Sequence, residues 1–232
     1  MSRNRLILVA AAVGAAGLLA LVLVLVTGKS TGATPTTAAA GTTAGRSIGS
    51  LAGIPQQGDT LGRATAPATL IVYEDPQCPY CRNWNVDTLP TIVEQYVRTG
   101  RLRLIYRGVV IIGPDSVRGL RASYAAGKQR KLWSFVDALY THQGAENSGW
   151  ITDAVIFEAA REAGANGQAI LKGMGSAAVD AALATAQTQA TADKVRGTPT
   201  FVIERPLARS QQLNVPGLDA ASFIPSLAAA FQ

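Results

Sequence analysis

The two cysteines of this chain lie close together in the segment DPQCPYC, which runs from Asp75 to Cys81, and the chain contains no other cysteine. A short apolar segment ends just before this motif, and a helical pattern begins inside it. Whatever fold the chain adopts must therefore hold both sulfurs at the turn between a strand and a helix. Two cysteines at this spacing can form half of a metal site, a small structural disulfide, or a redox pair that opens and closes during a reaction.

The residues on either side of the cysteines predict a strand, a helix and a second strand. Residues 68–74 read ATLIVYE, a short apolar run rich in strand-forming residues, as expected for a buried strand. From Pro79 to Gly100 the apolar residues recur at helical spacing, and residues 101–109 again have a strand-like pattern. A connection of this length implies that the two strands are parallel.

The remainder of the chain predicts a block of helices followed by two strands and a helix. The helical patterns run from about residue 114 to 195. The segment GTPTFVIE at 197–204 then predicts a strand, and QQLNVPG at 211–217 a further short one. Asp219 is a suitable cap for the final helix. Alternation of strands with helices indicates an α/β fold.

The first 28 residues have the pattern of a single-pass membrane anchor. The run Leu6–Val26 carries no charge and, as a helix, would reach ~30 Å, the thickness of a hydrocarbon core. Arg3 and Arg5 precede it, which favours a cytoplasmic N-terminus and places the rest of the chain on the extracytoplasmic side of the cell membrane. A cleaved signal peptide, with cleavage near Ala38–Ala40, is the alternative.

A stretch rich in Thr, Ala and Gly follows the apolar run. Such a composition cannot bury enough apolar surface to offset the entropy lost on ordering. We therefore expect residues 29–60 to be a flexible linker and residues 61–232 to form the folded domain, with the helical insertion at about 114–195.

The net charge gives no reason to expect nucleic-acid binding. The chain has a formal charge of +6, and three of its basic residues flank the apolar run. The remaining +3 is mild, whereas nucleic-acid-binding proteins usually concentrate basic residues on one face.

A redox pair is the role of the cysteines that the sequence favours. A structural zinc site needs four ligands, and the chain offers two cysteines and a single histidine, His142. A structural disulfide between such close residues would remove little unfolded-state entropy. Disulfides form and exchange outside the cytoplasm, where we expect this domain to lie. The redox chemistry of a dithiol requires neither a metal nor a cofactor.

The position of Cys78 explains how it could react. Pro79 suits the first turn of a helix, so Cys78 lies at a helix start, where unpaired N–H groups and a partial positive charge stabilise a thiolate. This lowers the pKa of Cys78 below the free value of about 8.5 and makes it a better leaving group. Cys81 lies one helical turn further, points inward, and is placed to attack a mixed disulfide on Cys78.

The motif EDPQCPYC follows a strand, a helical block comes next, and the segment GTPTF comes after that block. From about Ala68 to the C-terminus, this order of features resembles the DsbA-like thiol:disulfide oxidoreductases of the thioredoxin superfamily. The resemblance implies a thioredoxin fold with an inserted helical domain, in addition to the N-terminal transmembrane helix. It also implies a cis peptide bond between Thr198 and Pro199, packed against the sulfurs. The backbone of Thr198 would then be open to pair with an extended substrate chain.

Two positions depart from the family pattern. The residues between the cysteines are Pro79 and Tyr80, where the strongest oxidants of the family carry His in place of Tyr. We therefore expect a Cys78 pKa of about 4.5–6.5 and a less oxidising potential. Many relatives carry a buried acid six residues before the first cysteine, a position that is Val72 here. Asp75, which matches an Asp often seen in the Gram-positive-type branch, is the candidate acid for tuning the site.

These features predict an extracytoplasmic thiol:disulfide oxidoreductase, and most directly a DsbA-like oxidase acting on exported proteins with free cysteines. The family implies reoxidation by a membrane partner of the DsbB or vitamin-K-epoxide-reductase type. Two alternatives stay open at this point. One is a reductase or isomerase that uses the same site, and the other is a thioredoxin-like module that binds exported partners and keeps the cysteines as a fixed disulfide.

Overall fold

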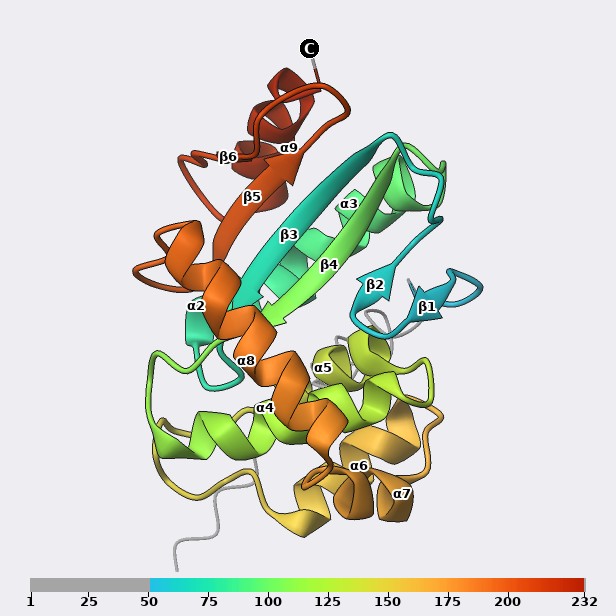
Figure 1. Ribbon diagram of the computed structural model, residues 1–232, viewed down its shortest axis with the longest axis vertical. Coiled ribbons are helices and arrows are strands. Elements are labelled where there is room, and N and C mark those ends of the chain that lie inside the picture. The colour runs from blue at the N-terminus through green and yellow to red at the C-terminus, as the bar shows by residue number, and fades with distance from the viewer. Residues whose placement is uncertain (1–50, 232) are drawn as a thin grey trace, which may run out of the picture. The chain divides into compact units, whose positions relative to one another are not determined.

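A mixed six-stranded sheet lies at the centre of residues 51–231, the part of the chain that the computed structural model describes. The elements in chain order are β1 (Gln56–Gln57), β2 (Thr60–Leu61), β3 (Ala68–Glu74), α2 (Pro79–Asn83), η1 (Trp84–Thr88), α3 (Leu89–Ile92), η2 (Val93–Val97), β4 (Leu102–Gly108), α4 (Pro114–Gly127), α5 (Leu132–Thr141), α6 (Asp153–Glu162), α7 (Gly167–Gly173), α8 (Ala177–Ala192), β5 (Thr200–Glu204), β6 (Gln211–Gln212) and α9 (Ala220–Ala229). In Figure 1, α8 crosses in front of the sheet and α3 lies behind it, while α4 to α7 lie beyond one end of the strands.

The strand order β1-β2-β4-β3-β5-β6 places β3 in the middle of the sheet. β3 pairs in parallel with β4, from Ala68 opposite Leu102 to Glu74 opposite Gly108, which confirms the predicted strand–helix–strand unit. On its other side β3 pairs antiparallel with β5. Helices cover both faces of β3, so all seven of its residues are buried, and this explains its continuous apolar sequence.

The helical connection between β3 and β4 is not a regular α-helix. Two π-helical segments, η1 and η2, alternate with α2 and α3. Pro90 lies in the first turn of α3, directly after η1. Because proline lacks an N–H, it cannot continue the hydrogen-bond ladder of a helix interior, and the wider π turn accommodates this break.

The helical block matches the insertion expected at about residues 114–195. It contains α4 to α8, and two of these helices begin with side-chain caps. The side chain of Thr152 accepts a hydrogen bond from the backbone N–H of Val155, and that of Asn166 from Ala169. The structure thus shows an α/β thioredoxin-like fold with an inserted helical region.

The folded part begins earlier than the sequence predicted. Leu51 and Ile54 are buried, β1 pairs with β2, and β2 pairs antiparallel with β4. Residues 51–60, which we expected to belong to the flexible linker, are therefore part of the fold. Strands of two residues are too short to produce a readable pattern, and they form here because β4 offers a free edge.

The predicted anchor at residues 1–28 and the linker up to residue 50 lie outside the described residues. Within 51–231, no helix combines the length and the hydropathy needed to cross a membrane.

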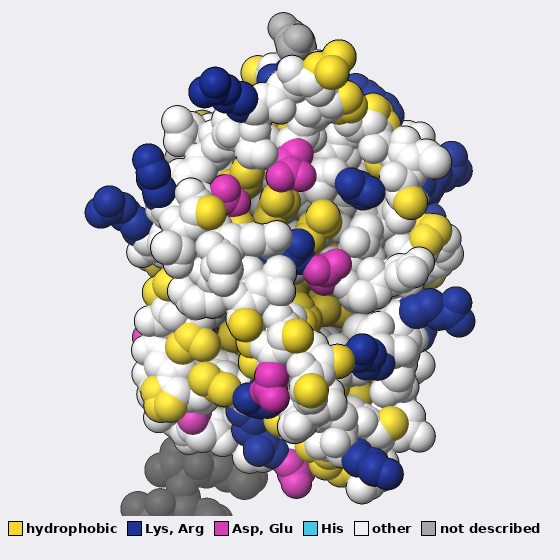
Figure 2. Space-filling view, in the orientation of Figure 1, with side chains coloured by type: hydrophobic (Ala, Val, Ile, Leu, Met, Phe, Trp, Pro, Cys, Tyr) yellow, Lys and Arg dark blue, Asp and Glu magenta, His cyan; other side chains and the backbone are white. Residues whose placement is uncertain are grey.

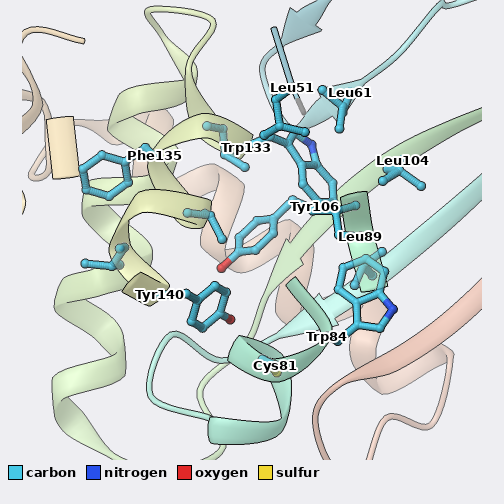
Figure 3. Close-up of a cluster of buried hydrophobic side chains, with 14 of the residues drawn as sticks. Leu51, Leu61, Cys81, Trp84, Leu89, Leu104, Tyr106, Trp133, Phe135 and Tyr140 are labelled. Carbon is cyan, nitrogen blue, oxygen red and sulfur yellow. The ribbon is translucent and has the colours of Figure 1, made fainter. Parts of the chain in front are cut away.

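Aromatic residues dominate the core on the side of the sheet that faces α2. Trp84 is fully buried, with its ring centroid 5.1 Å from that of Phe201 and 5.9 Å from that of Phe223. Figure 3 shows this cluster continuing toward the helical block, where Trp133 and Tyr140 lie, with Cys81 at its edge on α2. The second cysteine is thus part of the core.

Candidate active site

Cys78 caps the helix that follows the central strand. β3 ends at Glu74, a tight turn brings the N–H of Cys78 to within 2.9 Å of the carbonyl oxygen of Asp75, and α2 starts at Pro79. Cys78 has extended backbone angles, as an N-cap residue should. Its sulfur therefore lies beside the free N–H groups of the first helical turn, as the sequence predicted.

The loop before β5 meets this sulfur. The Thr198–Pro199 peptide bond is cis, as expected. In the thiol form the Cys78 Sγ donates a hydrogen bond to the Thr198 carbonyl oxygen at 3.2 Å. The hydroxyl of Thr198 is also buried. The structure therefore brings together two segments that are far apart in the sequence.

The site lowers the pKa of Cys78 to about 6. The largest cause is a hydrogen bond from the Cys81 thiol, while burial acts in the opposite direction. The Thr198 side chain and the backbone N–H groups of Cys81 and Tyr80 lower the pKa further by hydrogen bonding to the sulfur. The value falls within the predicted range, but the helix N-terminus is not the leading cause.

Cys81 has the opposite character. It is fully buried, and burial raises its pKa well above the usual value of a thiol. Its hydrogen bond to Cys78 and the nearby Glu74 carboxyl add to this effect, while a bond from the backbone of Asp75 opposes it. The two sulfurs therefore differ strongly in their readiness to ionise, and both are free thiols in the structure.

Glu74 is an acid whose charge acts on the buried sulfur of Cys81, and it was not among the predicted site residues. It is fully buried, with Oε1 accepting from the Asn85 side chain at 2.6 Å and Oε2 accepting from the Tyr140 hydroxyl at 3.3 Å. Burial raises its pKa well above the usual value of a glutamic acid. A charged residue at the end of an otherwise apolar strand was the signal that could have identified it.

Replacing Glu74 with glutamine should therefore change how stability depends on pH. Because the folded-state pKa of Glu74 is raised, the wild-type protein loses stability as the pH rises from about 4.3, the unfolded value, through the folded value. We expect Glu74→Gln to unfold at the same denaturant concentration as wild type near pH 4 and at a higher one at neutral pH. Glu146→Gln, at an exposed position, is the matched control. Equal midpoints for wild type and Glu74→Gln at both pH values would contradict this assignment.

Asp75 lies behind the sulfurs and organises the surrounding loops. Its Oδ1 accepts from the N–H of Gln77 at 2.9 Å and from the Ser116 hydroxyl at 2.6 Å. Its Oδ2 accepts from the N–H groups of Ile111 and Ile112 at 2.7 and 2.9 Å. The carboxylate is fully buried and satisfied by four donors, so it fixes the loop before Cys78 to the loop after β4 and to the start of α4.

The helical block also holds the active-site loop. The Gln143 side chain donates to the carbonyl oxygens of Pro76 and Cys78 at 2.9 and 3.1 Å. The side-chain oxygen of Gln77 accepts from the N–H of Asn147 at 2.6 Å. These contacts, which sequence patterns did not predict, show that the insertion positions the N-cap of α2.

The two residues between the cysteines are placed as a helix start requires. Pro79 occupies the first turn, and Tyr80 directs its ring outward with 63% of the residue exposed. Cys78 keeps only 3% of its surface exposed, against none for Cys81. Access to the reactive sulfur is therefore narrow, next to an exposed aromatic ring.

The cysteine pair lies at the start of the helix that follows the central strand β3, and it faces the cis-proline loop that precedes β5. This arrangement defines a thioredoxin-type redox site. A family model described as thioredoxin matches residues 56–212, and the chain belongs to this family. Solved structures of DsbA proteins share this fold, as the sequence resemblance implied.

Two relatives are proteins of disulfide bond formation. The chain is 34% identical over 105 residues to the probable disulfide bond formation protein D of Bacillus cereus, covering 44% of this chain and 49% of that protein. It is 26% identical over 103 residues to disulfide bond formation protein D of Bacillus subtilis, covering 44% and 46% of the two chains. The matches thus span about half the length of these relatives.

Solved structures share the fold over a larger part of the chain. A thioredoxin-like oxidoreductase from Silicibacter pomeroyi DSS-3 is 27% identical, with a TM-score of 0.58, and the match covers 78% of this chain and 96% of that one. BdbD from Bacillus subtilis in its oxidised form is 17% identical, with a TM-score of 0.63 and coverage of 76% and 96%. At 17% identity, the similarity to BdbD shows a shared fold.

Proposed function

We propose that this protein is an extracytoplasmic thiol:disulfide oxidoreductase that introduces disulfides into exported proteins. The observation that supports this most directly is the contrast between the two sulfurs, with the pKa of Cys78 lowered to about 6 and that of Cys81 raised. A sulfur that is stable as a thiolate is a good leaving group, so the Cys78–Cys81 disulfide is readily broken in favour of the reduced protein.

The reaction consists of two thiol–disulfide exchanges. A client thiolate attacks Sγ of Cys78 in the oxidised protein, the bond between Cys78 and Cys81 breaks, and Cys81 takes up a proton. A second thiolate of the client attacks the client sulfur of the mixed disulfide and releases Cys78 as a thiolate. The client loses two electrons and gains a disulfide, and the cysteine pair gains the two electrons.

Each predicted site residue has a role in this scheme. Cys78 and Cys81 are the catalytic pair, and the loop of Thr198 and Pro199 binds the client chain. Pro79 and Tyr80 tune Cys78 as part of the helix start, Tyr80 through its backbone N–H. Asp75 acts at a distance, by holding the loop that carries Cys78. To these we add Glu74, which is placed to exchange a proton with Cys81.

The location and partners complete the proposal. Residues 1–28 anchor the protein in the cell membrane, and the domain acts on exported proteins with free cysteines outside the cytoplasm. A membrane partner of the DsbB-like or vitamin-K-epoxide-reductase-like type reoxidises the pair. What supports this is the anchor-like sequence together with the DsbA-like site.

A reductase or isomerase would use the same residues at a lower potential. Equilibration of the protein in glutathione buffers separates these directions. A potential near about −270 mV, the value of thioredoxin, would indicate a reductase, whereas a clearly higher value supports the oxidase.

Replacement of Cys81 by alanine tests the activity itself. We expect Cys81→Ala, expressed as the full chain, to accumulate mixed disulfides with client proteins, because its Cys78 thiolate can attack client disulfides and Cys81 is no longer present to attack the resulting bond. These adducts should disappear on reduction and should be absent from Cys78→Ala. A module that only binds partners would form no adducts in either variant, and that result would overturn the proposal.

A further inference from the structure

A polar cavity of about 590 Å³ opens beside the loop that carries Thr198. Its wall is formed by the end of α8, the chain leading to Thr198, and the facing parts of β5 and β6. Figure 1 draws this region at the upper left, where α8 meets β5, and Figure 2 shows basic side chains projecting from the same edge. The catalytic scheme above makes no use of this cavity.

The charge of the cavity is unbalanced. Asp193, Lys194 and Arg196 line it. The Asp193 carboxylate already accepts a hydrogen bond from the Tyr73 hydroxyl at 2.6 Å. Lys194 and Arg196 are exposed, and neither forms an ion pair with any residue between 51 and 231. The cavity lining therefore carries two cations and one carboxylate, with an excess of positive charge.

The cavity lies within reach of a chain bound at the reactive sulfur. Arg196 precedes Thr198 by two residues, and the Thr198 carbonyl oxygen is 3.2 Å from Sγ of Cys78. Two residues of extended chain span about 6.6 Å. β6 pairs only with Val202 and Ile203 of β5, so it does not cover the segment next to Thr198. A client strand that pairs with this segment would pass the mouth of the cavity.

The hollow on the Tyr80 side of the site has the opposite charge. It is lined by Tyr80, Asn83, Asp87, Leu218 and Asp219, which include two acidic residues and no cation. An acidic client side chain is disfavoured there and favoured at the cavity of Lys194 and Arg196. The difference in charge between the two hollows indicates which side of the active site an acidic residue of the client would occupy.

We infer that the cavity of Lys194 and Arg196 selects client segments that carry Asp or Glu about two residues from the exchanging cysteine. This inference rests on the proposed function, because it concerns which chains exchange with Cys78. The recognition is electrostatic and partly exposed to solvent, so it adds selectivity to the exchange without being required for it.

The test uses short peptides with one cysteine and Glu, Gln or Lys placed two residues before or after it. The rate of mixed-disulfide formation is measured with the oxidised protein. For one of the two placements we expect the Glu peptide to react about five-fold faster than the Lys peptide, with Gln between them. Added salt should reduce this preference.

A double charge reversal, Lys194→Glu with Arg196→Glu, should invert the order of the Glu and Lys peptides. Lys128→Glu with Lys172→Glu is the control, since both residues are exposed outside the cavity, Lys128 just after α4 and Lys172 in α7, and the net charge changes equally. Equal rates for all peptides, or an order unchanged by the double reversal, would overturn the inference while leaving the oxidoreductase proposal intact. If no peptide exchanges with the wild-type protein, both fail.

Discussion

Replacing Asp75 with alanine is expected to destabilise the folded protein by about 3–5 kcal/mol. The carboxylate is fully buried, and its removal leaves four donors without an acceptor, from Gln77, Ser116, Ile111 and Ile112. The donors of Gln77 and Ser116 are buried, and each unsatisfied buried donor costs about 1–3 kcal/mol unless water enters, so the summed effect is large. Denaturant unfolding followed by circular dichroism measures the change.

Asp153→Ala is the matched control for this prediction. Its carboxylate pairs with Arg118 at the surface, with 64% of the side chain exposed, so its loss should cost less than about 1 kcal/mol. If Asp75→Ala were no more costly than Asp153→Ala, the hydrogen bonds of Asp75 would not hold the active-site loop in place.

The largest effect on activity is expected from Cys78→Ser. A serine hydroxyl cannot form a disulfide and is not ionised near neutral pH, whereas the pKa of Cys78 is about 6. The rate of oxidation of a dithiol peptide should fall by about 10³-fold or more. The rate is followed by mass spectrometry with glutathione disulfide as the final oxidant, and circular dichroism checks that the variant is folded.

Cys81→Ser provides the comparison. It retains Cys78 and should still form mixed disulfides with clients, although it lacks the Cys78–Cys81 disulfide with which the wild-type protein oxidises them. Activity of Cys78→Ser within about ten-fold of wild type would show that exchange does not pass through Cys78.

The local part of the fold could be predicted from the sequence because short-range patterns specify it. The apolar run of β3, the proline after Cys78 and the strand β4 together define a strand–helix–strand unit, and the structure confirms it. The cis bond at Pro199 followed from the family resemblance. No local pattern distinguishes it from any other Thr–Pro bond.

The parts that were missed depend on tertiary contacts. β1 and β2 form because β4 has an open edge, and their two-residue length leaves no periodic signal. Gln143 and Tyr140 lie about sixty residues from Cys78 in the chain, and only the packing of α5 against the active-site loop brings their side chains there. Hydrogen bonds across such distances have no signature in a single sequence.

The sequence correctly predicted that the pKa of Cys78 is lowered, but it did not predict the main cause of the lowering. The sequence placed Cys78 at a helix start and predicted a lowered pKa from the helix N-terminus. The structure places the Cys81 thiol within hydrogen-bonding distance, and this bond has the larger effect. The relative position of two sulfurs in one helical turn depends on side-chain packing, which the sequence pattern does not specify.

The central claim is that the folded protein holds Cys78 as a thiolate at neutral pH, and a thiolate-absorbance titration of the reduced protein tests it most directly. We predict one ionisation near pH 6 for Cys78, no ionisation of Cys81 in the neutral range, and a higher Cys78 pKa in Cys81→Ala, which lacks the donor thiol. A Cys78 pKa of about 8.5, the value of a free thiol, would contradict the account.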